Sequence, residues 1–452
     1  MRNRDTAFLG HPTGLGWLSA SEFWERFSYY GMQALLVLYM THYLLLPGHV
    51  EQVWGFVPFS HALKTLYGAL SPDAMASIIY GWYAGLVYVT PLLGGLLADR
   101  LTGRTVAVTL GASLMALGHF LMAFEASFLL ALLALLVGVG CFKGNIAAQV
   151  GDLYAEGDHR RADAFQIYYL GIQMAVIVSP FVCGTLGQTV GWHWGFGAAG
   201  VGMVIGLVIY LVGRPALPKE KKRDGGVVRA ALTARDRKAL ALLIALTPVL
   251  ALTLVGNMQI FNAYLIWAEK NFQIVFFGRT MPITWMLSLD AFVSTGLIAG
   301  SLMFWRWYAR HWREPGEIGK MTIGTVIAAS APLLLALASR TVAATGHPVS
   351  LWWAVGFHVL NDVGFANLLP VGLALYSRAA PKGLEGMMIA IYYLQIFGGN
   401  MLAGYLGSLY DGMGHAAFWL LHAGLMLAAA VAMALSARFA GPILEPGEEA
   451  PA

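Results

Sequence analysis

Long apolar segments recur along this chain, and they restrict its possible folds more than any other feature of the sequence. A helix needs about 20 largely apolar residues to cross the hydrocarbon layer of a membrane. Twelve segments meet this requirement, at residues 17–45, 74–98, 105–125, 128–150, 163–188, 195–213, 239–268, 281–306, 319–338, 351–376, 385–410 and 415–437. We therefore expect an all-α polytopic membrane protein with 12 transmembrane helices.

The composition disfavours other classes of protein. Of the 452 residues, 58% are hydrophobic and 12% are charged, whereas a soluble domain carries about 25% charged residues. The net charge of +4 is accompanied by no nucleic-acid-binding motif, so no nucleic-acid partner is expected. Cys141 and Cys183 lack the spacing of a disulfide framework or a zinc site. Without an HExxH or GxSxG motif, neither enzymatic activity nor a bound metal or cofactor is expected.

The segments separate into two groups of six around a stretch rich in Lys, Arg, Gly and Pro. This pattern predicts an N-terminal six-helix bundle over residues 1–213 and a linker over 214–238. A second six-helix bundle follows over residues 239–440, with a tail over 441–452. The N-terminus lacks a signal-peptide pattern, so the first segment is expected to be retained.

Lysine and arginine residues indicate the orientation, because cytoplasmic loops carry an excess of them. With the N-terminus inside, 22 of the 28 Lys and Arg residues fall on the cytoplasmic side and four on the other. Both termini are therefore expected in the cytoplasm, and the protein in the inner membrane of a cell. The two remaining basic residues, Arg26 and Lys143, are expected within the bilayer.

A short basic connection joins the second and third segments. Its sequence, "GGLLADRLTGR" at residues 94–104, resembles the signature of the major facilitator superfamily in that loop. With the six-plus-six layout, it predicts the major facilitator fold, in which two halves rock about a central substrate site. Asp99 is expected to meet a helix N-terminus, and Arg100 and Arg104 to face the cytoplasm. The alternative is a plain basic turn.

Six ionisable residues fall inside the apolar segments. A charge at the centre of a membrane helix costs at least about 2.5–3.5 kcal/mol, so it usually faces a bundle interior or a water-filled path. The candidates for proton coupling are Glu22, Glu25, Arg26, Lys143, Asp290 and Asp362.

The first segment places its polar residues on one helical face. The offsets of 0, 3, 4, 7, 8 and 11 belong to Glu22, Glu25, Arg26, Tyr29, Tyr30 and Gln33. This face is expected to form the polar wall of a cavity. The alternative is an internal structural ion pair between Arg26 and one glutamate, which still leaves one carboxylate over.

Lys143 is the candidate partner of that carboxylate. It lies in "GVGCFKGN", where Gly138, Gly140 and Gly144 would permit a neighbouring helix to approach closely. Protonating a paired glutamate would free the ammonium group for another anion. A purely structural lysine is the alternative.

The stretch "EFWERFSYYG", residues 22–31, matches the ExxERFxYYG signature of the proton-dependent oligopeptide transporter family. The similarity continues through most of the chain, for example in "YYLGIQMAVIVSP" and "GNMLAGYLG". The resemblance implies that Glu22, Glu25, Arg26 and Lys143 serve proton coupling and peptide recognition. It also implies substrate contacts by Tyr29, Tyr30, Tyr80, Gln173 and Tyr392 or Tyr393. We expect Gln33, Trp285 and Asn367 to contribute to the same substrate site.

The sequence departs from the family where peptide termini are usually bound. Gln33 stands for an arginine, and Met258 for its glutamate partner on the seventh segment. Phe365 replaces the glutamate of the tenth segment that usually engages the peptide amine. Asp362, three residues earlier, or Asp290, a titratable group where asparagine is common, is expected to take over that role. A helix-packing role is the alternative for both aspartates.

Charge counting suggests a coupling mechanism. Four acids face two bases in the predicted cavity, so the fully ionised state would carry a charge of −2. Burial and like-charge repulsion disfavour that state, and the resting outward-open protein is expected to hold at least one proton.

The expected function is therefore proton-coupled symport of di- or tripeptides by alternating access. The expected partners are a small peptide or related substrate, protons and the lipid bilayer. The alternatives are import of a non-peptide amphoteric metabolite by the same fold, and a non-transporting sensor.

Overall fold

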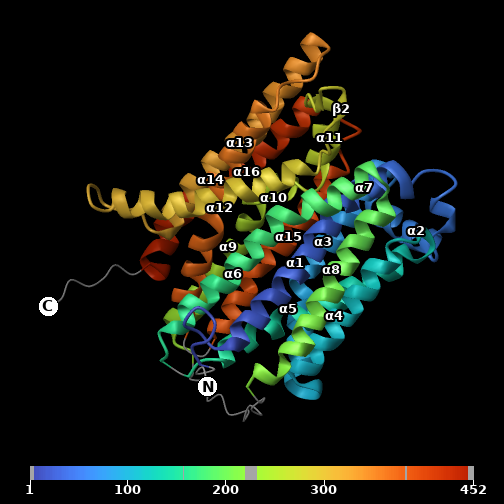
Figure 1. The fold of residues 1–452 in the computed structure, drawn as a ribbon. Helices are drawn as coiled ribbons and strands as arrows, with labels where there is room; N and C mark the ends of the chain where they lie inside the picture. Colours follow the sequence, from blue (N-terminus) through green and yellow to red (C-terminus); the bar gives the residue numbers. More distant parts are fainter. Residues whose placement is uncertain (1–4, 156, 219–231, 382–383, 446–452) are drawn as a thin grey trace. The chain divides into compact units, whose positions relative to one another are not determined.

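The computed structural model describes residues 5–155, 157–218, 232–381 and 384–445. The chain is almost entirely helical (Figure 1). Its first half contains α1 (Thr13–Tyr39), η1 (Met40–Leu44), η2 (Val50–Gln52), α2 (Phe56–Tyr67), α3 (Pro72–Leu97), η3 (Ala98–Thr102), α4 (Arg104–Leu121), η4 (Glu125–Ser127), α5 (Phe128–Asp152), α6 (Arg160–Ser179), η5 (Pro180–Gly184), α7 (Thr185–Thr189), α8 (Trp192–Gly213) and η6 (Arg214–Ala216).

The second half is also helical apart from one short hairpin. It contains α9 (Ala234–Thr253), α10 (Val255–Met258), α11 (Ala263–Asn271), β1 (Val275–Phe276), β2 (Arg279–Thr280), α12 (Trp285–Tyr308), α13 (Glu317–Thr345), α14 (Trp352–Arg378), α15 (Glu385–Gly407) and α16 (His415–Leu444). The hairpin strands are antiparallel, with Val275 opposite Thr280 and Phe276 opposite Arg279.

Ten helical runs of the described residues are long and apolar enough to cross a membrane. They are Pro72–Thr102, Arg104–Leu121, Glu125–Asp152, Arg160–Thr189, Trp192–Ala216, Trp285–Tyr308, Glu317–Thr345, Trp352–Arg378, Gly386–Gly407 and His415–Leu444. The first predicted segment corresponds to α1, which carries more charge. The seventh corresponds to the run from α9 to α11, which is interrupted. The multi-pass character is clear, and the count of 12 stays a prediction.

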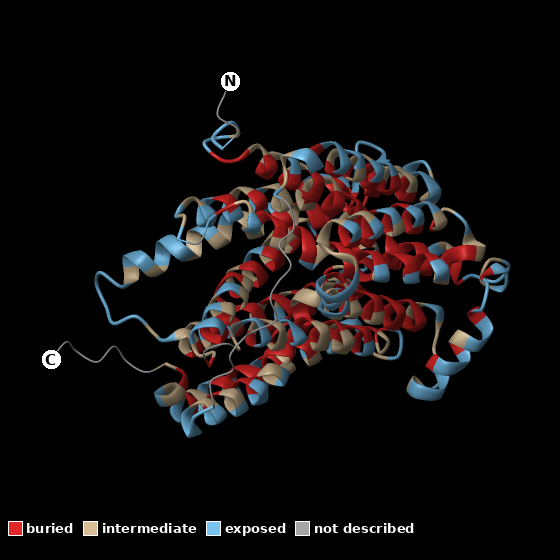
Figure 2. Cartoon of the chain, turned by 90° about the horizontal axis from the view of Figure 1, so that it is seen from below, coloured by how far each residue is buried: buried red, intermediate tan, exposed pale blue. Residues whose placement is uncertain are grey.

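Large apolar side chains cover the outer faces of the helices. Leu93, Leu133, Leu337 and Phe439, for example, are each more than half exposed. Buried and exposed positions alternate along the long helices (Figure 2). In water such surfaces would drive association, whereas lipid tails solvate them.

The chain forms two compact units. The N-terminal unit comprises Met1–Pro72 and Val89–Asp224, and the C-terminal unit comprises Asp73–Tyr88 and Gly225–Ala452. The first part of α3 therefore packs within the C-terminal unit, where Gly81 lies against the backbone of Gly404 on α15. The predicted bundle bounds stay a prediction.

Close helix contacts in the N-terminal unit rely on small residues. A Cβ atom on Gly94 of α3 would lie 2.0 Å from the Gly140 carbonyl oxygen of α5. Gly138 meets α4 through Gly111 in the same way, whereas Gly144 has only an ordinary contact. The predicted role of glycines in helix approach is thus fulfilled by Gly138 and Gly140.

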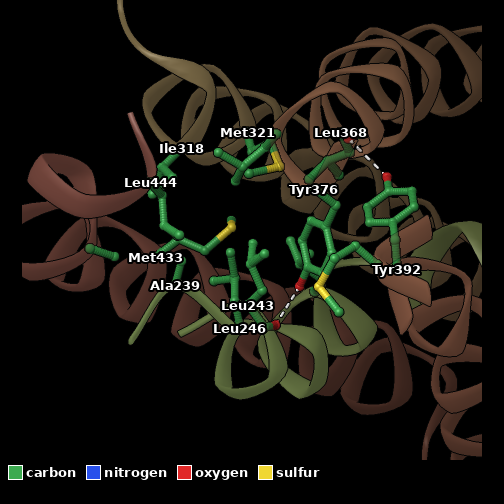
Figure 3. Close-up of a cluster of buried hydrophobic side chains, with 14 residues drawn as sticks. Ala239, Leu243, Leu246, Ile318, Met321, Leu368, Tyr376, Tyr392, Met433 and Leu444 are labelled. Atoms are coloured by element: carbon green, nitrogen blue, oxygen red, sulfur yellow. Dashed lines mark hydrogen bonds between the residues drawn. The ribbon is translucent and has the colours of Figure 1, made fainter. Parts of the chain in front are cut away.

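The core of the C-terminal unit lies between α9, α13, α14, α15 and α16. Figure 3 shows 14 buried side chains of this core, including Leu243, Met321 and Met433. Tyr376 donates a hydrogen bond to the Leu243 carbonyl at 2.7 Å, which ties α14 to α9. Buried hydroxyls usually require such a partner.

Several boundaries differ from the sequence predictions. Residues 219–231 of the predicted linker lie outside the described residues, and α9 begins within the linker because Thr233 and Asp236 form a capping box. Helix α16 runs to Leu444 and so includes the first residues of the predicted tail. Residues 98–102, predicted as part of a loop, continue α3 as the π-helical η3, and Gly103 at φ 76° ends the run.

The seventh predicted segment is interrupted rather than continuous. Helix α10 ends at Met258, and α11 starts only after Asn262, whose φ of −128° is not helical. The Gln259 side chain stabilises this break by donating to the Ala403 carbonyl at 2.9 Å. Gly256, Asn257 and Asn262 have low helix propensity, which favours an interruption here. The surface helix α2 was likewise not predicted.

Candidate functional site

The charged residues of α1 form a buried cluster in the N-terminal unit. Glu22, Glu25 and Arg26 are 2%, 0% and 2% exposed. Arg26 contacts Glu25 through two nitrogens, with Nη2 donating to Oε1 at 2.6 Å and Nε donating to Oε2. Its Nε also lies 3.3 Å from Glu22 Oε1. One guanidinium thus pairs with both carboxylates, and the two-nitrogen contact fixes its plane.

Aromatic side chains complete the surroundings of this cluster. The Arg26 guanidinium lies over the Tyr29 ring, 5.0 Å from its centroid. Tyr30 interacts with Arg26, and Tyr168 of α6 hydrogen-bonds Glu22. Such a site stabilises charges that water would otherwise solvate.

Helix packing holds α1 in place around the cluster. Ser21 of α1 donates to the Gly206 carbonyl of α8 at 2.9 Å, and Gly206 lets the two helices approach closely. Ser28 donates back to the Glu25 carbonyl at 2.7 Å. Packing against α8 therefore holds α1, the helix that carries the acidic and basic side chains.

Lys143 of α5 is partly buried and interacts electrostatically with Glu22, Glu25 and Arg26. The structure thus brings together the four residues that the family signature and the fourth segment predicted. With all four ionised, the two acids and two bases sum to zero charge. The N-terminal cluster is therefore electrically balanced without an added proton.

A second buried cluster lies in the C-terminal unit. His358 Nδ1 of α14 and Asp290 Oδ1 of α12 are hydrogen-bonded at 2.7 Å. The other ring nitrogen, Nε2, hydrogen-bonds the Tyr264 hydroxyl of α11 at 2.9 Å. Three helices thus meet at one imidazole, which is 0% exposed.

Asp362 lies one turn after His358 on α14 and is 1% exposed. Its Oδ1 accepts a hydrogen bond from the Asn361 side chain at 3.0 Å, whereas its Oδ2 has no hydrogen-bond partner among the described residues. It also interacts electrostatically with Asp290. The predicted site residues Asp290 and Asp362 therefore belong to one cluster, and it contains two acids without Lys or Arg.

Two other predicted substrate contacts are engaged in helix packing. Asn367 Oδ1 accepts from Trp305 Nε1 at 2.5 Å and from Ser301 at 3.1 Å, which joins α14 to α12. Tyr392 donates to the Leu369 carbonyl at 2.5 Å and lies in the core of Figure 3. A role of either residue in substrate binding stays a prediction.

The remaining predicted contacts lie on four different helices. Tyr80 is on α3, Gln173 on α6, Gln33 on α1 and Trp285 at the start of α12. Tyr80 and Gln33 are buried, whereas Gln173 and Trp285 are partly exposed.

The predicted conformational signature lies at the end of α3 and the start of α4. Asp99 and Arg100 are exposed on η3, and Arg104 forms an ion pair with Asp152 of α5. This pair joins α4 to α5 within the N-terminal unit. A role of these residues in conformational change stays a prediction.

Three residues of the two clusters were missed from the sequence. Tyr168 lies in "IYYLGIQ", a stretch quoted above only for its family likeness. His358 and Tyr264 lie 94 residues apart, so nothing local in the sequence connects them. His358 could have been found from its position, because it lies one helical turn before Asp362 and a residue at that spacing shares the same helical face.

Comparison with known proteins identifies the family. The sequence model of the POT family matches residues 105–234 and 229–420. This chain belongs to the POT family. Its relatives include the peptide transporter YePEPT of Yersinia enterocolitica, which is 29% identical over 88% of this chain and 88% of the relative. A di-/tripeptide transporter of Lactococcus lactis subsp. cremoris is 28% identical over 87% of this chain and 88% of its own length.

Solved structures of the POT family support the fold. The crystal structure of peptide transporter POT in complex with sulfate has a TM-score of 0.83 and 25% identity, covering 97% of this chain and 96% of that chain. The predicted family and the all-α membrane transporter fold are thereby confirmed, and the count of 12 helices stays a prediction. The chain is a multi-pass membrane protein of a transporter family.

Proposed function

We propose that this POT family protein is a proton-coupled symporter of di- and tripeptides in a cytoplasmic membrane, with both termini in the cytoplasm. The observation that carries the proposal is the presence of ionisable clusters within apolar helices, Glu22, Glu25, Arg26 and Lys143 in one unit and Asp290, His358 and Asp362 in the other. Charged groups persist inside a membrane helix bundle when they bind ions or substrate. The relatives' names, peptide transporter and di-/tripeptide transporter, support the same substrate class.

The two clusters suggest a division of roles. The N-terminal cluster supplies positive charge from Arg26 and Lys143, and the C-terminal cluster supplies negative charge from Asp362. Proton binding to the acids makes inward movement of substrate depend on an acid gradient. The gradient supplies the free energy, and no cofactor is required.

Lys143 provides the experiment. We expect Lys143→Ala to abolish gradient-driven dipeptide uptake in proteoliposomes, because the substrate carboxylate loses a cation in a low-dielectric site. Lys270 offers a matched control, since it is exposed at the end of α11. Normal uptake by a folded Lys143→Ala protein, or equal loss in Lys270→Ala, would contradict the assignment.

A second candidate is transport of a non-peptide amphoteric metabolite. Gln33, Met258 and Phe365 favour it, because the family residues they replace serve peptide termini. Counterflow with a panel of dipeptides, tripeptides and single amino acids separates the two. Exchange of peptides supports the first proposal, and exchange confined to other metabolites supports the second.

A further inference from the structure

His358 is a fully buried histidine of α14 whose ring contacts a carboxylate. Its ring links Asp290 on one side to Tyr264 on the other. The Tyr264 ring is itself held by stacking on Phe357, with centroids 4.8 Å apart and planes 14° apart. The imidazole is therefore fixed in orientation by three helices.

The Lys and Arg residues of the three helices lie in their last turns: Lys270 in α11, beside Glu269, Arg306 in α12 and Arg378 in α14. Helix α13 has no ionisable residue between Lys320 and Arg340, which lie towards its two ends, and α10 has none. Tyr392 of α15 engages the Leu369 carbonyl instead. The ionisable groups around His358 are therefore Asp290, Asp362 and Tyr264.

The charge balance requires protons at this place. With a neutral imidazole and both aspartates ionised, the cluster carries a charge of −2 in a buried setting. Even with an imidazolium, a charge of −1 remains. His358 and Asp362 are buried and the Asp290 side chain is 16% exposed, so an uncompensated charge here costs free energy and proton uptake by the cluster is favoured.

The geometry lets His358 gain a proton without losing a contact. In the neutral ring, Nδ1–H donates to Asp290 and Nε2 accepts from the Tyr264 hydroxyl. An added proton forms an N–H bond at Nε2, and the Tyr264 hydroxyl turns to accept from it. Both hydrogen bonds survive in both states, which is what a reversible proton site requires.

We infer that His358 and Asp290 form a proton-binding site of the C-terminal unit, in which His358 carries the transported proton. This inference rests on the proposed function, and it separates two aspartates that the sequence treated alike. Asp290 is engaged by His358, whereas the Oδ2 atom of Asp362 has no hydrogen-bond partner among the described residues. Asp362 is thereby assigned to the cationic group of the substrate.

The site lies at one end of its helices. His358 is six residues after the start of α14, Asp290 is five after the start of α12, and Tyr264 is in α11, before the hairpin. In the proposed orientation these ends face the outside of the cell. A proton from that side would reach His358 early in the transport cycle.

Replacing His358 by glutamine tests the inference. Glutamine keeps hydrogen-bonding capacity but does not titrate, so gradient-driven dipeptide uptake should fall by about tenfold or more. Dipeptide counterflow, which needs no net proton movement, should stay within about threefold of the unaltered protein. Unchanged uptake with an unchanged pH profile in His358→Gln would overturn the inference.

His422 is a matched control in the same unit. It is also 0% exposed, but it bonds Gln259 and the Phe418 carbonyl rather than a carboxylate. His422→Gln should leave the pH profile of uptake in place. A loss of gradient-driven uptake equal to that of His358→Gln would show a general effect of removing buried histidine, and would overturn the inference.

Tyr264→Phe provides a milder variant if His358→Gln fails to fold. It removes one hydroxyl while keeping the ring stack on Phe357 and the His358–Asp290 contact. The imidazolium then loses an acceptor, so half-maximal uptake should move to lower pH. An unchanged midpoint would contradict the role of this hydrogen bond.

A measurement without substrate separates this inference from the proposed function. Nitrogen-15 spectra of labelled histidine, compared between the unaltered protein and His358→Gln, isolate the His358 ring signal. The signal should change from neutral imidazole to imidazolium on acidification, and Asp290→Asn should shift that change. A ring that stays neutral overturns the inference even if peptides are transported. A titrating ring in a protein that moves no peptide overturns the proposed function alone.

Discussion

At the scale of single residues, Arg26 is the central charge of the N-terminal unit. Its guanidinium group forms ion pairs with both Glu22 and Glu25, and all three side chains are buried. Removing one partner of a buried ion pair leaves the others uncompensated, which costs far more than losing an exposed pair.

We therefore expect Arg26→Met to lower the stability of the N-terminal unit by about 3–5 kcal/mol. Arg104→Met is the matched control, because its partner Asp152 is 50% exposed and such pairs contribute about 0–1 kcal/mol. The measurement is thermal unfolding of both variants in detergent. Equal shifts in melting temperature would contradict this account of Arg26.

The sequence predicted residues at this scale where the pattern is local. Glu22, Glu25 and Arg26 lie within five positions, so helical spacing alone places them together. His358 was missed because its partners come from α11 and α12, and contacts between distant segments leave no local trace. Asn367 was predicted as a substrate contact, and its hydrogen bonds to Ser301 and Trp305 of α12 could not be predicted from the local sequence.

At the scale of helices, close approach depends on individual glycines. Gly94 and Gly95 are neighbours on α3 but face different surroundings. A Cβ atom on Gly94 would meet the α5 backbone, whereas one on Gly95 would have nothing within 4 Å. Close packing against α5 therefore requires glycine at position 94, whereas position 95 has space for a larger side chain.

Gly94→Ala should destabilise the protein by about 1–3 kcal/mol, because the α3 and α5 backbones must move apart. Gly95→Ala should be neutral or stabilising by up to about 1 kcal/mol, since alanine favours a helix. Melting temperatures of the two purified variants check this. A loss in Gly95→Ala as large as that in Gly94→Ala would argue against the close α3–α5 contact.

Helix positions were predictable and helix interruptions were not. Apolar length alone located α4, α5, α8 and α12 to α16 within several residues at each end. The break between α10 and α11 depends on side-chain contacts of Gln259 with α15 and α16, which apolar length does not encode.

At the scale of the whole molecule, each unit carries one buried ionisable cluster with a different charge balance. The N-terminal cluster of two acids and two bases is neutral when ionised. The C-terminal cluster of two aspartates and one histidine is not. The charge of −2 that the sequence placed in one cavity therefore belongs to the C-terminal unit, which is where coupling protons are expected to bind.

Gradient-driven uptake by the purified protein in proteoliposomes tests this account most directly. With an acidic exterior, a labelled dipeptide should accumulate inside above its outside concentration, and a protonophore should abolish the accumulation. Liposomes without protein provide the background. Peptide that only equilibrates across the membrane, or that accumulates equally without a pH gradient, would contradict proton-coupled peptide symport.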